Sequence, residues 1–331
     1  MKIHQKLILV FLWLTCLFGC FHQQALAQQG QVLGIHILQP YELEQADQLL
    51  SLTDDDKWIY VTIPFTVTDL ERPDFWRDFF TQTKERKVIP IIRLAGYFEN
   101  GAWQVPNRKQ LVDQIEFLSA LPWPTEQRYL IVFNEVNHAA EWGGQLDPAG
   151  YVEVLKFVSN WAHTENNGFK ILPAAMDLAA PNGGQTMEAF TYLQQMHQAD
   201  PEIFSYLDVW NSHSYPNPGF SGSPQATAKN SLRGFEHELA WLKQKTGQYY
   251  PVMITETGWV MSRATTPWLE SYYTYALQHI WSHPQVIAVT PFTLQGDPGP
   301  FAGFSFLDRN GQPTAQYRAA QAAVKKLHQD S

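Results

Sequence analysis

The sequence predicts an α/β fold organised as a single (β/α)8 barrel, or TIM barrel, and three observations lead to that prediction. Eight apolar runs alternate with segments of helical periodicity. The runs are almost continuously apolar, as parallel strands buried on both faces are. No glycine-rich phosphate-binding turn follows the first run, which argues against an open doubly wound sheet. Eight strand–helix units therefore fit a barrel better.

The eight predicted strands are spread along the whole chain after its first 31 residues. They cover residues 32–38, 58–64, 87–94, 129–135, 169–176, 206–213, 251–256 and 286–292.

Capping signals mark several of the helices between these strands. Asn107 followed by Gln110 predicts a capping box, and Asp147 before a proline predicts another helix start. Gly247 predicts a helix end. An alanine-rich helix is expected over about residues 314–328.

The first 27 residues have the pattern of a secretory signal peptide. Two lysines precede the apolar run LILVFLWLTCLFGC, and Ala25-Leu26-Ala27 forms a small-residue cleavage site. We therefore expect residues 1–27 to be removed and residues 28–331 to form one catalytic domain in a secreted or periplasmic protein. Two alternatives stay open: a lipoprotein anchored through Cys20, and a single N-terminal membrane anchor. No later run is long enough to span a membrane.

Cysteine and charge content narrow the classes of function. Both cysteines, Cys16 and Cys20, lie in the predicted leader, so the mature domain has no disulfide, thiolate nucleophile or cysteine metal ligand. Without the two leader lysines, 21 basic residues face 32 acidic ones, a net charge of −11. This charge argues against a nucleic-acid partner.

Two predicted strands end in a glutamate. The fourth continues as RYLIVFNEVNH and reaches Glu135, and the seventh continues as YYPVMITETGW and reaches Glu256. A carboxylate is costly to bury unless it is paired, so it adds nothing to a buried strand. In a barrel, however, strands four and seven end at the same mouth. Two carboxyl groups about 5 Å apart there are what retaining glycoside hydrolysis requires.

The two motifs resemble the signature strands of the clan GH-A glycoside hydrolases, a superfamily of (β/α)8 enzymes that includes families 5, 10, 39 and 53. The resemblance follows the strand order over essentially the whole mature chain. It implies that Glu135 is the general acid/base, that Glu256 is the nucleophile and that Asn134 binds the sugar 2-hydroxyl. The chain departs from the family at Val136, where many members have proline, and at TPFTLQG, where many have a tryptophan beneath the sugar.

Polar residues at other strand ends are candidates for supporting roles. The resemblance implies a hydrogen bond from the end of the sixth strand to the nucleophile, for which we favour Tyr215, with His213 beside it. Arg93 at the end of the third strand could lower the pKa of Glu256 or hold a carboxylated sugar. Alternatively, it pairs with an acid such as Glu99.

Long aromatic loops follow the predicted strands, and aromatic faces stack on sugar rings. Tryptophans in these loops, together with polar residues that end the fifth and eighth strands, are therefore candidate sugar contacts: Trp103, Trp142, Trp259, Asp177 and Gln295.

The sequence thus predicts a secreted retaining β-glycosidase that acts on a polysaccharide or oligosaccharide. We expect no cofactor and no metal, since paired carboxylates need none and no His-Glu-x-x-His pattern occurs. A transglycosylase would use the same residues. A carbohydrate-binding barrel without turnover is the alternative of another class. The sugar, the linkage, endo or exo action and the oligomeric state are left open.

Overall fold

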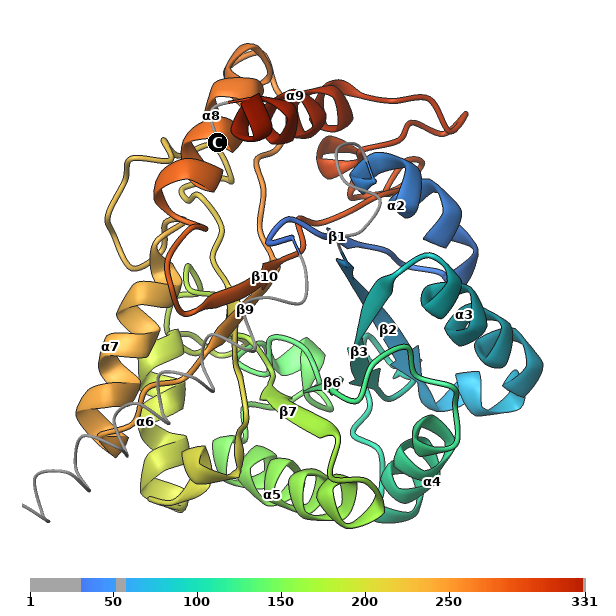
Figure 1. Ribbon diagram of the computed structural model, residues 1–331. Coiled ribbons are helices and arrows are strands. Elements are labelled where there is room, and N and C mark those ends of the chain that lie inside the picture. The colour runs from blue at the N-terminus through green and yellow to red at the C-terminus, as the bar shows by residue number, and fades with distance from the viewer. Residues whose placement is uncertain (1–30, 52–57, 330–331) are drawn as a thin grey trace, which may run out of the picture.

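The computed structural model describes residues 31–51 and 58–329. The predicted signal peptide and the alternative lipid site at Cys20 lie outside these ranges, so both remain predictions. Parallel strands occupy the centre of the molecule and helices lie around them (Figure 1). The α/β class with parallel strands is therefore confirmed.

Eight parallel strands pair in two sheets. One has the order β1-β2-β3-β6-β7 and the other β10-β9-β8. The bounds are β1 Ile35–His36, β2 Ile59–Thr66, β3 Val88–Ala95, β6 Arg128–Val132, β7 Phe169–Pro173, β8 Trp210–His213, β9 Val252–Glu256 and β10 Val286–Val289.

The two sheets are linked at both pairs of edges. Leu33 just before β1 forms a parallel bridge with Val289 of β10, and Gly34 N–H donates to the Val289 carbonyl at 2.8 Å. At the other edge, Asp177 beyond β7 bridges His213 of β8. Bridges therefore join the segment before β1 to β10 and the segment after β7 to β8, in addition to the pairing within each sheet.

A helix follows each of these strands. The helices are α2 Leu43–Leu50, α3 Pro73–Glu85, α4 Arg108–Ser119, α5 Pro148–Glu165, α6 Ala189–Ala199, α7 Gly234–Thr246, α8 Leu269–His279 and α9 Ala315–Gln329. In the described part of the chain, none of them is long and apolar enough to cross a membrane.

The predicted caps are confirmed. Asn107 accepts a hydrogen bond from Gln110 N–H, and the Gln110 side chain accepts one from Asn107 N–H. Asp147 accepts from Gly150 N–H ahead of α5. Gly247 ends α7 with a positive φ of 73°. These local signals could be identified in the sequence because each depends on residues within one turn.

Several strands are shorter than the sequence predicts. The fourth run was expected over residues 129–135, but β6 ends at Val132 because the chain turns there, with a φ of 73° at Phe133. In the sixth run, predicted over residues 206–213, Tyr206 is the last residue of the 3-10 helix Ile203–Tyr206, and β8 starts only at Trp210. Apolar periodicity cannot detect these endings, since the residues beyond them are buried as well.

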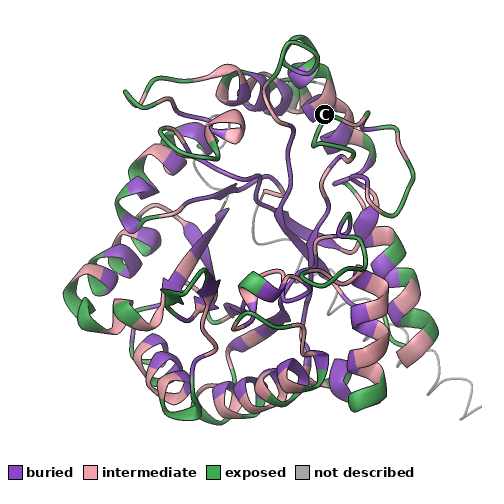
Figure 2. Cartoon of the chain, turned by 180° about the vertical axis from the view of Figure 1, so that it is seen from behind, coloured by how far each residue is buried: buried purple, intermediate pink, exposed green. Residues whose placement is uncertain are grey.

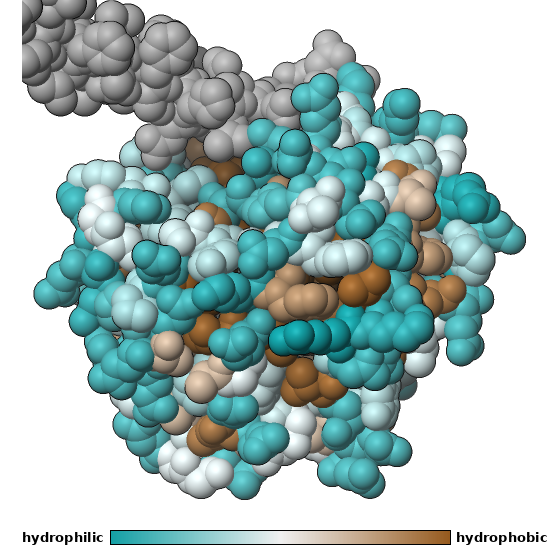
Figure 3. All heavy atoms as spheres, turned by 90° about the horizontal axis from the view of Figure 1, so that it is seen from below, coloured by the Kyte–Doolittle hydropathy of each residue, from teal (hydrophilic) through white to brown (hydrophobic). Residues whose placement is uncertain are grey.

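Burial separates two apolar layers. One cluster lies between strands and helices, and each helix turns its buried side toward the strands (Figure 2). A second cluster joins inner side chains from both sheets: Tyr60, Ile89, Ile91, Tyr129, Ile131, Leu172, Val209, Met253, Ile287 and Ala288. The outer face seen in Figure 3 is mostly hydrophilic, with small scattered apolar patches. Helices that are buried on one face and exposed on the other gain their stability mainly from the buried face.

One buried carboxyl lies behind β8. Glu238 of α7 is fully buried, and its Oε2 accepts a hydrogen bond from Ser212 Oγ at 2.5 Å. Ser212 also contacts Ser214 Oγ at 2.8 Å. Burial raises the pKa of Glu238 to about 8, although the bond from Ser212 acts in the opposite direction.

We predict that Glu238→Gln makes the protein less sensitive to rising pH. Folded Glu238 keeps its proton up to a pKa of about 8, whereas the unfolded carboxyl loses it near its ordinary value of 4.5. The wild type therefore loses stability as pH rises between these values, by at most about 1.4 kcal/mol per pH unit. The amide does not titrate, so its stability relative to wild type should increase with pH.

The measurement is urea unfolding at pH 5, 6.5 and 8. Glu153→Gln, at an exposed position of α5, is the matched control and should follow the wild type. If the free energies of unfolding of wild type and Glu238→Gln change in parallel with pH, Glu238 has the same pKa in the folded and the unfolded protein, and the prediction is wrong.

Candidate active site

The carboxyl ends of neighbouring strands bring several polar residues to one level. His213, the last residue of β8, is the register partner of Glu256, the last residue of β9. On its other side His213 is bridged to Asp177 beyond β7. Because parallel strands present their ends at one edge, these three side chains form a lateral row.

Glu135 reaches this row from a turn rather than from a strand. It lies beyond the end of β6 and has a positive φ of 27°, and Phe133 two residues earlier also has a positive φ. Such conformations are costly for residues with a side chain and concentrate at functional sites. The backbone strain turns the Glu135 carboxyl toward β8.

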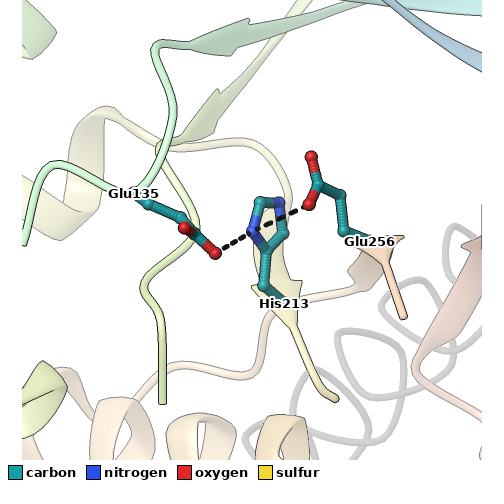
Figure 4. A group of neighbouring side chains, drawn as sticks. All are labelled: Glu135, His213 and Glu256. Atoms are coloured by element: carbon teal, nitrogen blue, oxygen red, sulfur yellow. Dashed lines mark hydrogen bonds and ion pairs between the residues drawn. The ribbon is translucent and has the colours of Figure 1, made fainter. Parts of the chain in front are cut away.

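His213 lies between the two glutamates, as Figure 4 shows. Its Nδ1 is 2.9 Å from Glu135 Oε1 and 3.7 Å from Glu256 Oε2. One ligand-type atom from each of the three residues lies within 4.8 Å of the others. The two carboxyl groups that the sequence places on separate strands are therefore close neighbours.

Arg93 and Tyr215 hold the Glu256 carboxylate from two directions. Arg93 Nη1 donates to Oε1 at 2.6 Å, and Tyr215 OH donates to Oε2 at 3.1 Å. Both predicted contacts are present, and Arg93 pairs with Glu256 rather than with Glu99. Arg93 Nη1 also donates to Asn134 Oδ1 at 2.8 Å, which places the amide beside the two glutamates.

The surroundings of Glu256 favour its ionised form. Burial opposes ionisation, but the nearby charges of His213 and Arg93 hold the pKa of Glu256 well below its usual range. For His213, burial lowers the pKa, but the charge of Glu256 and the hydrogen bond that His213 donates to Glu135 outweigh burial and raise the pKa overall. Burial and the nearby carboxylates raise the pKa of Tyr215, so its phenol stays a donor.

His36 and Phe292 complete this side of the site. His36 is fully buried, and its Nε2 is 3.7 Å from Glu256 Oε1. Burial, with the charge of Arg93, lowers the pKa of His36 to about 3, so it is neutral here. Phe292 belongs to the segment TPFTLQG, in which many clan GH-A enzymes have a tryptophan. Its ring packs edge-on against the ring of His36, with 5.0 Å between the ring centroids.

Two of the predicted sugar-stacking tryptophans are core residues, and these two predictions are wrong. Trp259 is fully buried against Tyr273 and Trp281, and its Nε1 donates to the Gly222 carbonyl at 2.9 Å. Trp142 is 3% exposed and packs on Phe133. Neither ring has a free face for a sugar, because both loops fold back onto the helices and bury their aromatic residues.

Trp103 does lie near the surface, on a hairpin that the sequence analysis did not predict. Strands β4 Phe98–Glu99 and β5 Ala102–Trp103 pair antiparallel within the loop after β3. The ring of Trp103 is 5.6 Å from that of Phe98, which is 62% exposed. Asn100-Gly101, both with positive φ, forms the turn. Asn-Gly is the strongest short hairpin signal, so this element could have been found in the sequence.

The remaining two predicted residues are placed differently from one another. Asp177 lies in the row with His213, but its carboxylate is engaged by His138 Nε2 at 2.9 Å and by Ala179 N–H at 2.8 Å. Gln295 is half-buried beyond β10, and within the described ranges its side chain makes no hydrogen bond.

The site also contains two titratable residues that the sequence analysis did not select, Glu141 and His138. Glu141 lies in the 3-10 helix Ala139–Glu141, and burial and the charge of Glu135 raise its pKa. Its side chain contacts Asn134. Both residues follow the Asn-Glu motif by a few positions, and only the tight turn after β6 brings them back beside it.

Glu135, His213 and Glu256 could in principle bind a divalent cation, since one ligand atom of each lies within 4.8 Å of the others. Arg93, however, already places a positive charge against Glu256. The prediction of a metal-free site remains a prediction.

Solved structures share this fold. A family 39 glycoside hydrolase from Bacteroides cellulosilyticus matches with a TM-score of 0.63 at 15% identity, over 91% of this chain and 65% of that chain. A glucosidase from Croceicoccus marinus has a TM-score of 0.63 at 9% identity, over 90% and 68% of the two chains. An endo-β-1,4-glucanase from Xanthomonas axonopodis pv. citri has a TM-score of 0.56 at 12% identity, over 90% and 99%.

At these identities the likeness shows the fold alone, and that fold is the one that the resemblance to clan GH-A implies. This chain spans 65% of the length of the family 39 enzyme. No protein-family model and no curated protein matches the sequence.

Proposed function

We propose that this protein is a retaining β-glycoside hydrolase that cleaves a polysaccharide or oligosaccharide by double displacement. Glu256 is the nucleophile and Glu135 is the general acid/base. We further infer that the strands close into a (β/α)8 barrel, which the bonds between the sheet edges and the shared inner cluster support.

The separation of the two carboxylates is the observation that carries the proposal. Their nearest oxygens lie within 4.8 Å of each other. Retaining enzymes place their two carboxyl groups about 5–5.5 Å apart, whereas inverting enzymes leave about 6.5–9.5 Å for a water molecule. The space between Glu135 and Glu256 favours direct attack by a carboxylate on the sugar.

In the first half of the reaction, Glu256 attacks the anomeric carbon and Glu135 gives its proton to the departing glycosidic oxygen. Arg93 and Tyr215 keep the attacking carboxylate ionised and fixed. The carbon–oxygen bond to the leaving sugar breaks as the ester bond to Glu256 forms. Asn134, which accepts a hydrogen bond from Arg93, is the residue that we expect to bond the sugar 2-hydroxyl.

In the second half, Glu135 removes a proton from water, which attacks the anomeric carbon and releases Glu256. The ester oxygen leaves as a carboxylate, which Arg93 and Tyr215 receive. Net retention of the β configuration follows from the two inversions. If a sugar hydroxyl replaces water, the same residues perform transglycosylation.

The distribution of exposed aromatic residues supports a glycan as the substrate. Of the seven large apolar residues that are notably exposed in the described chain, six lie in segments that follow a strand and only Tyr249 precedes one. The six are Tyr41, Tyr97, Phe98, Phe220, Trp268 and Phe301. Strand-to-helix loops form the functional face of such folds, and aromatic rings suit sugar rings.

The ligands bound in two matched structures guide the choice of glycan. One Xanthomonas structure holds cellopentaose, and a Thermotoga maritima enzyme holds mannotriose. We therefore propose a neutral β-linked glucan or mannan as the first substrates to test. A binding barrel without turnover is less well supported, because both carboxylates are in place.

We also propose that the protein is exported and that its leader is cut after Ala27, as its first residues indicate. The intact mass of the protein recovered from its native host should then equal that of a chain that begins at Gln28. A lipid-bearing Cys20 at the new N-terminus would instead establish the lipoprotein alternative, and an uncut chain would contradict both.

We predict that Glu135→Ala and Glu256→Ala each lower kcat/KM on the best glycan by about a hundredfold or more. Added azide should then distinguish the two roles. In Glu135→Ala the sugar ester still forms, and azide attacks it to give a β-glycosyl azide. In Glu256→Ala azide replaces the missing carboxylate and gives an α-glycosyl azide.

Glu99→Gln, an exposed carboxyl on the β4–β5 hairpin, is the matched control and should keep wild-type activity. Proton NMR should show the β-anomer first in the wild-type reaction. Full activity in either glutamate variant, or the α-anomer first, would contradict the assigned roles.

We predict that Arg93→Met moves the acid limb of the pH profile of kcat/KM to higher pH by about one unit or more. Loss of the guanidinium 2.6 Å from Glu256 raises the pKa of that carboxyl, so the nucleophile becomes protonated at a higher pH. Arg93→Lys keeps the charge and should move the limb less. An unmoved acid limb in Arg93→Met would show that Arg93 does not control the ionisation of Glu256.

A further inference from the structure

The loops that follow β6 and β7 are bonded into one unit by Asn137. This residue is fully buried, and its Nδ2 donates to the carbonyls of Asp177 at 3.0 Å and Met187 at 2.9 Å. Its Oδ1 accepts from Asp177 N–H at 3.1 Å. An antiparallel bridge from His138 to Thr186 joins the same two loops. The backbone around His138 is therefore fixed before any ligand arrives.

His138 and Asp177 form a hydrogen-bonded pair on these loops. His138 Nε2 is 2.9 Å from Asp177 Oδ2, and Asp177 Oδ1 accepts from Ala179 N–H. Both side chains are 30% exposed. With both of its oxygens engaged, Asp177 fixes the imidazole ring, as carboxylates do for functional histidines.

The second ring nitrogen of His138, Nδ1, has no hydrogen-bond partner among residues 31–51 and 58–329. An oriented imidazole with one free nitrogen and an exposed edge is available to a bound molecule. In the part of the chain that the structure describes, no hydrogen bond or ion pair joins the side chain of His138 or Asp177 to Glu256.

The position of this pair relative to Glu135 indicates which part of the substrate it meets. His138 N–H donates to the Glu135 carbonyl at 2.8 Å, and the side-chain charges of Glu135 and Glu141 act on the His138 ring. In the proposed reaction the departing oxygen lies at Glu135 and the anomeric carbon at Glu256. Groups beside Glu135 and away from Glu256 therefore face the leaving sugar.

The chemistry around His138 selects a neutral hydroxyl. Nδ1 accepts a hydrogen bond in the neutral ring and donates one in the charged ring, and a hydroxyl can serve both forms. A carboxylated sugar would meet the carboxyl groups of Glu135, Glu141 and Asp177 at the same place. Like charges at short range disfavour that ligand.

We propose that His138, oriented by Asp177, bonds a hydroxyl of the leaving-group sugar through Nδ1 and so sets the preference for a neutral sugar on that side of the cleaved bond. The inference rests on the proposed function. His138 is then a specificity-determining residue, and Asp177 is its positioning residue rather than the direct sugar contact that the sequence predicts.

The test compares substrates that do and do not have a leaving sugar. The mature wild type and His138→Phe are first assayed on cellopentaose or mannopentaose, whichever the wild type cleaves faster. Both are then assayed on the methyl and 2,4-dinitrophenyl β-glycosides of the shorter of the two oligosaccharides that this cleavage releases. The variant should lose about five- to tenfold in kcat/KM on the pentasaccharide, the effect of one hydrogen bond. Both glycosides without a leaving sugar should change less than twofold.

His163→Phe is the matched control, because His163 Nε2 pairs with Asp208 Oδ2 at 3.0 Å with similar exposure, at the opposite ends of the strands. It should leave all three rates unchanged. If His138→Phe does not fold, as judged by its thermal transition, His138→Ala removes the ring without added bulk and takes its place.

Each other outcome overturns the inference. Equal losses on all three substrates would show a general structural effect, and a loss on the methyl but not the dinitrophenyl glycoside would show that His138 acts through proton donation by Glu135. Unchanged rates would show that no sugar bond is made. A wild type that cleaves none of the three would reject the proposed function itself, and the inference with it.

Discussion

The buried carboxylate of Glu256 is the constraint on which the rest of the site depends. Glu256 is only 8% exposed, and an unpaired charge buried to that extent would be strongly unfavourable. The charges of Arg93 and His213 and the phenol of Tyr215 offset that cost. Arg93 lies near the end of β3, His213 ends β8, and Tyr215 lies in the loop beyond β8. The alignment of those strand ends is therefore what keeps the Glu256 carboxylate ionised inside the protein.

In the stretch Asn134–His138, some side chains point into the candidate site and others support the loops around it. Asn134 contacts Arg93, and Glu135 contacts His213. Val136 is fully buried in the apolar core, Asn137 bonds the neighbouring loop, and His138 pairs with Asp177. Because the turn after β6 alternates these directions, the polar residues face the site or the next loop while the chain remains anchored in the core.

The sequence allows the fold class, the two glutamates and their immediate partners to be predicted, because strand order and strand ends are encoded locally. It does not allow exposure within loops to be predicted. Trp259 and Trp103 both follow strands, but Trp259 is buried against Tyr273 of the next helix, α8, whereas Trp103 stays near the surface on a hairpin. Asp177 was recognised as a strand-end acid, but its partner His138 depends on a contact between two loops. Contacts of that kind require the tertiary structure.

In the proposed mechanism, the hydrogen bonds of Asn137 link sugar binding at His138 to the position of Glu135, the proposed general acid. The same amide that holds Asp177 lies two residues from Glu135, so the loop that carries the acid and the loop that orients His138 cannot shift independently. A leaving sugar bonded at His138 would therefore be held at a fixed distance from the proton donor. Proton transfer requires hydrogen-bond geometry, and a small displacement of the proton donor slows it strongly. With the two loops rigidly connected, the binding energy of the leaving sugar at His138 would hold the glycosidic oxygen in that geometry and so lower the barrier to bond cleavage.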